Sequence, residues 1–343
     1  MSDVPIITFS PFTSDSDAEI VVPFHNRILQ ESYPRRRPLS IDEFRARFDT
    51  LRMQLIAFGI NDETGDLSAL GLSVQWLDGT NARLQYLQML VRPDMRRRGL
   101  GRALLGRGLE IAEDTGRDVI TFNVVDTVPA GEAFARTIEA DLGLREHINI
   151  VAVPDLDMSM LRGWRSDGPK RAPGYELLAW TDGYPQQFDA DIARLFVIAD
   201  EDMPFEDAAF EPGAATAETV RERLDRTRDT VRRVTSTIRH VASGGIVGFS
   251  EIVTRQSDDP TLNTTLTVVH RDHRGHALGK WIKADAILRA LDRFPHATHI
   301  QTENAFSNAP MLGINDAIGF KPEHTLTSYQ ASTARIRSYL EGS

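Results

Sequence analysis

Residues 96–102 are the stretch whose side chains are best suited to bind a phosphate group. We call this stretch the first basic loop; it consists of Arg96, Arg97, Arg98, Gly99, Leu100, Gly101 and Arg102. Arginine offers planar sets of donors that fit phosphate oxygens, and glycine lets the backbone approach a ligand closely. Free amides at the start of a following helix, with the helix dipole, favour an anion at the same place. The stretch therefore predicts a pyrophosphate site.

The elements that must position this loop are a strand before it and a helix after it. The apolar run Leu84–Val91 predicts the strand, and Leu105 and Leu109 lie at helical spacing beyond the loop. Further upstream, Ser40 with Glu43 three residues later is typical of a helix start with a capping box. We therefore expect strand, basic loop and helix in direct succession.

Two common phosphate motifs do not fit the first basic loop. The dinucleotide fingerprint requires a third glycine three residues after the second one, and Leu104 stands at that position. The Walker loop requires a lysine and a hydroxyl residue directly after its last glycine, and no such string follows Gly99 or Gly275. A nucleotide-dependent enzyme that uses the Gly99 loop remains an alternative.

The pattern of the first half of the chain recurs in the second half. Gly275 follows Gly99, and Gly319 follows Gly143, at the same interval of 176 residues. One shared interval at two landmarks predicts two copies of one domain. The segment between the copies is rich in glycine and proline, which is typical of a connector. The expected organisation is a first domain at residues 1–155, a linker at 156–174 and a second domain at 175–343.

The second copy contains a comparable loop, which we call the second basic loop. It consists of Arg274, Gly275, His276, Ala277, Leu278, Gly279 and Lys280. In the 176-residue alignment Asp272 stands opposite Arg96, which argues for weaker phosphate binding in this copy. His270, His273 and His276 recur at every third residue, a spacing compatible with an anion site or a metal site. The arginines between them favour the anion, so we predict no metal.

Arg96-x-x-Gly99-x-Gly101 resembles the R/Q-x-x-G-x-G/A signature of the GNAT superfamily of N-acetyltransferases. The duplicated chain looks like the tandem type, similar to mycothiol synthase-like acetyltransferases. The resemblance implies an α/β (α+β) fold with two acyl-CoA N-acyltransferase domains, each a mixed, mostly antiparallel sheet with helices on both faces. It also implies acetyl-CoA as cosubstrate, no metal, and direct attack by a primary amine of a small molecule.

Further contacts to acetyl-CoA follow from the same resemblance. Two strand segments would present backbone groups to the pantetheine arm: Met89, Leu90 and Val91 in the first copy, and Thr267, Val268 and Val269 in the second. In this family a bulge usually opens the strand there and supplies an oxyanion donor. Asn304 and Asn308 follow a strand and would contact the pantetheine arm, cap the next helix, or do both.

The chemistry implied by the resemblance needs a base and an acid. Glu251 and Glu303 are the candidate bases, because an ammonium cannot attack a thioester. The tyrosine that often serves as acid in this family is replaced by Glu139 in the first copy and by Asn315 in the second. The missing tyrosines keep a second interpretation open, a non-catalytic acyl-CoA-binding pseudo-enzyme or sensor.

The composition narrows the function further. The 343 residues carry a formal net charge of −10, which argues against a nucleic-acid partner. There is no cysteine, which excludes disulfides, thiolate metal sites and cysteine nucleophiles. No signal peptide and no apolar run of membrane-spanning length are visible. We therefore expect a cytoplasmic monomer or homodimer with no membrane partner.

Overall fold

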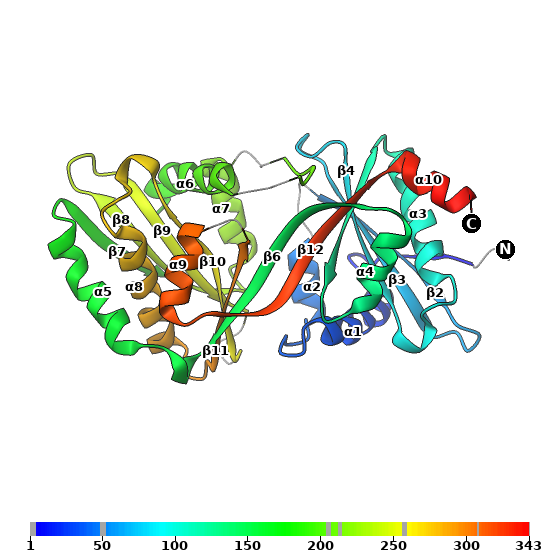
Figure 1. Ribbon diagram of the computed structural model, residues 1–343, viewed down its shortest axis with the longest axis horizontal. Coiled ribbons are helices and arrows are strands. Elements are labelled where there is room, and N and C mark those ends of the chain that lie inside the picture. Colours follow the sequence, from blue (N-terminus) through cyan, green and yellow to red (C-terminus); the bar gives the residue numbers. More distant parts are fainter. Residues whose placement is uncertain are drawn as a thin grey trace. The chain divides into compact units, whose positions relative to one another are not determined.

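The computed structural model describes residues 5–48, 53–203, 207–211, 215–255, 259–306 and 309–342. The chain forms two compact units, which are coloured along the sequence in Figure 1. Unit 1 comprises residues 1–145, 205–211 and 325–343, and unit 2 comprises residues 146–204 and 212–324. Each unit is described by itself below.

Unit 1 is built around one mixed sheet with helices on both faces. Its elements are β1 (Ile7–Phe9), α1 (Asp15–Ser32), α2 (Ile41–Phe48), β2 (Met53–Asn61), β3 (Leu67–Trp76), β4 (Leu84–Val91), η1 (Pro93–Met95), α3 (Leu100–Asp114), β5 (Val119–Val125), α4 (Pro129–Thr137), part of β12 (Lys321–Ser332) and α10 (Thr333–Glu341). The strand order is β1-β2-β3-β4-β5-β12. The predicted capping box starts α2: the Ser40 amide donates to Glu43 Oε2 over 2.7 Å, and the Glu43 amide donates to Ser40 Oγ over 3.1 Å.

Unit 2 repeats this arrangement with different sequence. Its elements are most of β6 (Asp141–Ala152), η2 (Val153–Asp155), α5 (Met158–Arg171), β7 (Tyr175–Thr181), η3 (Gln186–Phe188), α6 (Asp189–Asp202), α7 (Ala217–Arg226), β8 (Arg232–His240), β9 (Ile246–Thr254), β10 (Thr261–Val269), η4 (Arg271–His273), α8 (Leu278–Arg293), β11 (His299–Ala305) and α9 (Ala309–Ile318). The strand order is β7-β8-β9-β10-β11-β6. In each unit one pair of neighbouring strands is parallel, β4 with β5 and β10 with β11, and the other pairs are antiparallel. The predicted fold class, two mixed and mostly antiparallel sheets with helices on both faces, is confirmed.

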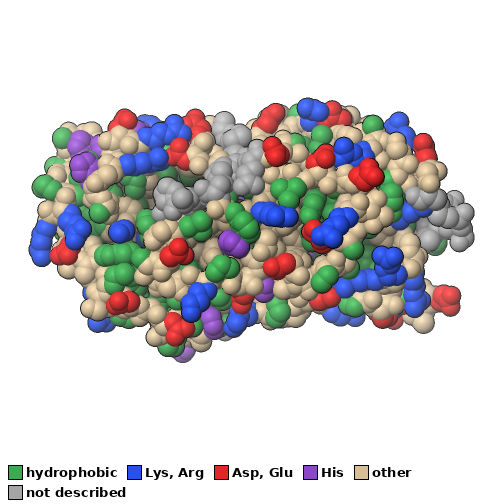
Figure 2. All heavy atoms as spheres, viewed as in Figure 1, with side chains coloured by type: hydrophobic (Ala, Val, Ile, Leu, Met, Phe, Trp, Pro, Cys, Tyr) green, Lys and Arg blue, Asp and Glu red, His purple; other side chains and the backbone are tan. Residues whose placement is uncertain are grey.

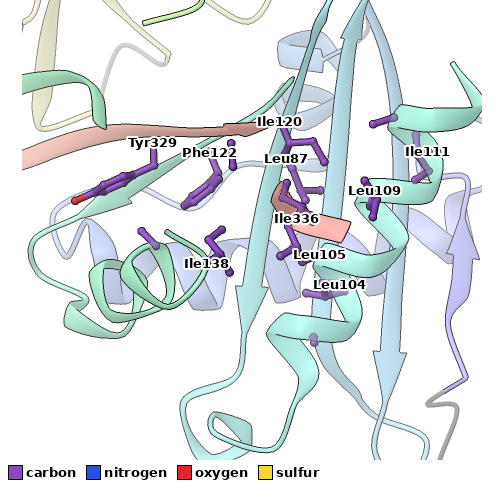
Figure 3. Close-up of a cluster of buried hydrophobic side chains, with 14 of the residues drawn as sticks. Leu87, Leu104, Leu105, Leu109, Ile111, Ile120, Phe122, Ile138, Tyr329 and Ile336 are labelled. Atoms are coloured by element: carbon purple, nitrogen blue, oxygen red, sulfur yellow. The ribbon is translucent and has the colours of Figure 1, made fainter. Parts of the chain in front are cut away.

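Apolar side chains fill both faces of the unit 1 sheet. Helices α3, α4 and α10 cover one face, and Figure 3 shows the core beneath them: Leu87, Leu104, Leu105, Leu109, Ile111, Ile120, Phe122, Ile138, Tyr329 and Ile336. Helix α3 lies so close to β4 that a Cβ atom at Gly108 would stand 2.5 Å from a methyl carbon of Leu87. Helices α1 and α2 cover the opposite face, where Phe24, Phe44 and Leu72 are buried.

Helix α5 occupies the segment that the sequence marks as a linker. Gly163, Gly168 and Pro169 suggested a connector, but these residues lie within a helix that packs on α8. A Cβ atom at Gly168 would stand 2.1 Å from the Trp281 ring, so glycine serves close helix packing at this position. Helices α6 and α7 cover the other face of the sheet.

The outer strand of each unit comes from the other copy of the repeat. Strand β12, at the end of the second copy, pairs with β5 of unit 1 from Leu326–Val125 to Ser332–Val119 (Figure 1). Strand β6, at the end of the first copy, pairs with β11 of unit 2. The compact units therefore differ from the contiguous segments 1–155 and 175–343, which remain a prediction about the sequence repeat. The cause is an exchange of end strands.

The surface in Figure 2 carries interspersed basic and acidic side chains over the face in view. Within the described ranges, no helix combines the length and the apolar character that crossing a membrane requires.

The strand exchange predicts where damage to the C-terminal helix will be felt. Ile336 of α10 is fully buried in the unit 1 core. Ile336→Ala should cost about 2–4 kcal/mol, and hydrogen exchange should rise in α3 and β5 while α8 and β10 keep their protection. Ser338→Ala, at an exposed position of the same helix, is the control. Loss of protection centred on α8 would contradict the exchange.

Candidate functional site

The parallel strands of each unit separate after a few residue pairs. Strands β4 and β5 pair at Leu84–Val119, Gln85–Ile120 and Tyr86–Thr121, and β4 then continues to Val91 beside β3 alone. In unit 2 the last of four β10–β11 pairs is Thr264–Thr302. Beyond these points one edge of β4 and of β10 has no described strand partner. An extended chain such as pantetheine can bind to such an edge through backbone hydrogen bonds.

The predicted cofactor-binding strand segments lie on these free edges. Residues 89–91 follow the split in unit 1, and residues 267–269 follow it in unit 2. The expected bulge is present in unit 2, where the register of β10 against β9 shifts between Thr264 and Leu266. It is absent from unit 1, where the register of β4 against β3 is constant from Gln85 to Val91, so the expectation of a bulge in both copies is wrong.

The two basic loops share one backbone conformation at an interval of 178 residues. Arg97 and Gly275 have φ angles of 62° and 86°, and the caps of the next helices, Gly99 and Ala277, have φ angles of 83° and 57°. Arg274, and not Asp272, therefore stands opposite Arg96. The 176-residue alignment is wrong at the loop because it matched glycines by type, whereas the left-handed positions are what correspond.

Arg96 holds the first basic loop in place. Its Nε donates to the Val91 carbonyl over 3.3 Å, Nη1 donates to Glu31 Oε1 over 2.9 Å, and Nη2 pairs with the other carboxylate oxygen. These contacts tie the end of β4 to the last turn of α1. Arg97 and Arg98 are exposed and make no hydrogen bond or ion pair with the residues described, so these two are available to an anion.

Arg274 performs the same role in the second basic loop. Its Nε donates to the Val269 carbonyl over 3.0 Å, and its Nη2 pairs with Asp202 at the end of α6. Arg271 also bonds Asp202, with a nitrogen–oxygen distance of 2.7 Å. The arginines around the second loop are thus engaged with carboxylates, which leaves less unpaired positive charge there than in the first loop.

The outer basic residues of the two loops lie against neighbouring elements. Arg102 bonds the Leu340 carbonyl, and its guanidinium lies 5.6 Å from the centre of the Tyr339 ring, so it faces α10. Lys280 Nζ lies 5.1 Å from the Trp164 ring of α5. A phosphate at either loop would therefore depend mainly on backbone amides and the residues nearest the turn.

The three histidines of the second copy meet two further aromatic residues. His273 Nδ1 lies 3.0 Å from the Tyr175 hydroxyl, and its ring centre lies 4.8 Å from that of His240 and 5.6 Å from that of His270. The His276 ring lies 5.6 Å from Tyr175. Burial and the neighbouring imidazoles lower the pKa of His273. Among the described residues no group of histidines and carboxylates is arranged to hold a metal ion.

The sequence gave no sign of a buried polar chain in unit 2. Lys283 of α8 is fully buried and donates to Asn315 Oδ1 of α9, and Asn315 Nδ2 donates to Asn304 Oδ1 of β11 over 2.5 Å. Burial lowers the pKa of Lys283 from 10.5 to about 7. Asn304 is therefore fixed inside unit 2, next to the strand split. Asn308, the other predicted asparagine contact, lies outside the described residues.

The end of each repeat also needs a new alignment. Strands β5 and β11, and the left-handed residues Glu139 and Gly319, correspond at 180 residues. Gly319 is therefore opposite Glu139 and not opposite Gly143. Asn315 is opposite Ala135 of α4, a buried residue. Neither unit has a tyrosine at the position where the family resemblance places the acid.

A tyrosine does reach α4 of unit 1 on the exchanged strand. The Tyr329 hydroxyl of β12 donates to Glu132 Oε2 over 2.6 Å. This hydrogen bond lowers the pKa of Glu132, while burial and the same bond raise the pKa of Tyr329. The pair joins α4 to the outer strand, and the tyrosine stays protonated at neutral pH.

The two candidate bases lie in different environments. Glu251 of β9 is fully buried, with Arg223 Nη2 at 2.8 Å, Arg233 Nε at 3.5 Å and the Thr265 hydroxyl at 3.0 Å. Glu303 of β11 is exposed. An enclosed carboxylate beside two guanidiniums does not contact an incoming amine directly, so only Glu303 has the access that a direct base requires.

Comparison with known proteins agrees with this geometry. Residues 24–137 match the acetyltransferase (GNAT) family, whose general chemistry is acyl transfer from an acyl-CoA. A search of curated proteins gave no match.

Three solved structures share the fold over most of the chain. The first is a tandem GNAT protein from the clavulanic acid biosynthesis pathway, with 22% identity, a TM-score of 0.77, and coverage of 96% of this chain and 98% of that one. The second is a GCN5-related N-acetyltransferase from Sphaerobacter thermophilus, with 13% identity, a TM-score of 0.66 and coverage of 96% of each chain. The third is the N-myristoyltransferase of Saccharomyces cerevisiae, with 12% identity, a TM-score of 0.59, and coverage of 96% and 80%. The tandem GNAT architecture expected from the sequence is confirmed.

The left-handed caps give a prediction about stability. Ala277 adopts a φ angle of 57° that costs an L-residue about 1 kcal/mol and costs glycine almost nothing. Ala277→Gly should therefore raise the free energy of unfolding by up to about 1 kcal/mol. Gly99→Ala, at the equivalent position of the first loop, should lower it by a similar amount. Urea denaturation measures both, and a loss of stability in Ala277→Gly would refute the assigned conformation.

Buried Lys283 predicts a pH-dependent stability. The folded protein releases this proton at about pH 7, whereas the unfolded chain keeps it to about pH 10.5, so stability rises with pH between these values. The slope is at most about 1.4 kcal/mol per pH unit. Lys283→Met lacks this contribution, so its stability relative to wild type should be highest near pH 6 and should fall toward pH 10.

Thermal unfolding of both proteins across this pH range tests the prediction. Lys280→Met, at an exposed lysine on the same helix, controls for the loss of one positive charge. A difference between Lys283→Met and wild type that stays constant with pH would show that the lysine is charged in the folded protein.

Proposed function

We propose that this chain is an N-acetyltransferase that moves the acetyl group of acetyl-CoA to a primary amine of a small molecule. The observation that carries the proposal is the succession of a separated strand edge, a basic loop and a helix N-terminus in each unit. Backbone groups along the edge suit the amides of pantetheine, and the loop suits the pyrophosphate.

The first basic loop fits the diphosphate better than the second. Arg97 and Arg98 are exposed beside the free amides at the start of α3, and Arg96 fixes the turn. In the second loop the amides of α8 play the same part, with His276 and Ala277 in place of Arg98 and Gly99. We infer that both units bind acetyl-CoA and that unit 1 binds it more tightly.

Bound acetyl-CoA supplies a thioester whose carbonyl carbon is open to nucleophilic attack. In the proposed reaction the amine nitrogen forms a C–N bond as the C–S bond breaks, the nitrogen gives a proton to solvent, and the sulfur takes one up. The chain's own residues bind the phosphates, align the strand edge and exclude water. These effects act through positioning of the two reactants.

A second candidate function is acyl-CoA binding without turnover. Ala135 and Asn315 stand where the family resemblance places a tyrosine acid, and neither can donate a proton to a thiolate. Isothermal titration with acetyl-CoA, combined with a thiol-release assay against a panel of amines, separates the two functions. Binding without release from any amine would favour the sensor.

Matched loop variants test the donor sites. Arg98→Ala with Gly101→Glu removes positive charge and places a carboxylate at the first helix start, so it should eliminate the tighter acetyl-CoA site in a calorimetric titration. His276→Ala with Gly279→Glu makes the corresponding change at the second loop and should leave the tighter site intact. An unchanged isotherm for the first variant would mean that the first loop does not bind the donor.

A further inference from the structure

The bulge in β10 places one hydroxyl at the strand split of unit 2. Thr265 is the extra residue between Thr264 and Leu266, and it directly follows the last pair of β10 with β11. A bulge turns a side chain away from the regular alternation of a strand. Thr265 is exposed although it belongs to a central strand. Its side chain is therefore accessible where the strand edge becomes free.

The Thr265 hydroxyl has a fixed orientation. It donates its hydrogen to Glu251 Oε1 over 3.0 Å. A hydroxyl has one hydrogen and two lone pairs, so this hydroxyl can meet a further partner only as an acceptor. Arg223 and Arg233 hold the Glu251 carboxylate from α7 and β8, and Arg233 is itself buried. The result is a rigid acceptor at an exposed position.

Unit 1 has no counterpart of this network. The pairing registers place Leu72 opposite Glu251, Ala57 opposite Thr235 and Leu55 opposite Arg233. Leu72 and Ala57 are buried in an apolar core, which shows that the fold needs no charge there. Burying a carboxylate between guanidiniums often stabilises a protein less than apolar residues of similar size would. The network in unit 2 therefore calls for a role other than stability.

We propose that Thr265 contacts the acyl acceptor in unit 2, by accepting a hydrogen bond from the attacking amine, and that Glu251 is the positioning residue that fixes this hydroxyl. The inference rests on the proposed acetyl transfer and assigns turnover to unit 2. An N–H bond directed at Thr265 Oγ1 turns the nitrogen lone pair toward the free edge of β10, along which the thioester would lie. Unit 1 then contributes donor binding, and its split has no equivalent hydroxyl.

An isosteric pair of variants tests the contact. Thr265→Val removes the acceptor, whereas Thr264→Val removes a neighbouring buried hydroxyl that has no hydrogen-bond partner among the described residues. With the best amine of the panel, Thr265→Val should lower kcat/KM for the amine about tenfold or more and leave KM for acetyl-CoA within twofold. Thr264→Val should match wild type, and Thr265→Ser should recover most of the loss.

Glu251→Gln tests the positioning role, because glutamine keeps the shape but weakens the hold on the hydroxyl. It should raise KM for the amine while KM for acetyl-CoA stays unchanged. Wild-type kinetics in Thr265→Val would overturn the inference, as would equal losses in Thr264→Val and Thr265→Val. Activity that survives the second-loop variant would also overturn it and leave the proposed transfer intact. If the wild type releases no thiol with any amine, the proposed function itself fails, and the inference fails with it.

Discussion

Both units depend on two parallel strands that pair for three or four residues and then separate. Buried backbone amides and carbonyls need partners, so a strand edge that opens inside a sheet must be filled by solvent or by a ligand. The protein keeps this edge open with charged contacts. Arg96 with Glu31, and Arg274 with Asp202, tie the end of the diverging strand to a helix on the other side of the loop. The same arginine thus shapes the loop and holds the split.

The two units use one backbone plan with different interiors. Where unit 1 has Leu72 and Leu105 in apolar cores, unit 2 has Glu251 and Lys283 at the equivalent positions. Each of these buried groups is costly to desolvate. A duplicated scaffold can tolerate this cost in one copy while the other copy keeps its apolar core. This asymmetry favours turnover in unit 2 and tight donor binding in unit 1.

Local sequence patterns predicted the local structure well. The strand at residues 119–125, the capping box of α2 and the loop before α3 all follow from short-range spacing. The equivalence of the two loops was misjudged because Ala277 can adopt the left-handed conformation of Gly99 at a modest cost, so residue type did not reveal it. The burial of Lys283 was invisible for another reason. A lysine in a helix reads as surface until the packing of α9 is known.

The strand exchange was beyond local patterns because strand partners are chosen by long-range pairing. Each copy of the repeat encodes its last strand for the other unit, so β5 is completed by β12 and β11 by β6. A chain cut between residues 155 and 175 would leave both halves with an unpaired edge, which invites pairing with other chains. Within one chain the partner strand is always present at high effective concentration. The tandem arrangement is therefore a requirement of the fold itself, and it explains how one copy could lose polar groups from its interior without losing its place in the protein.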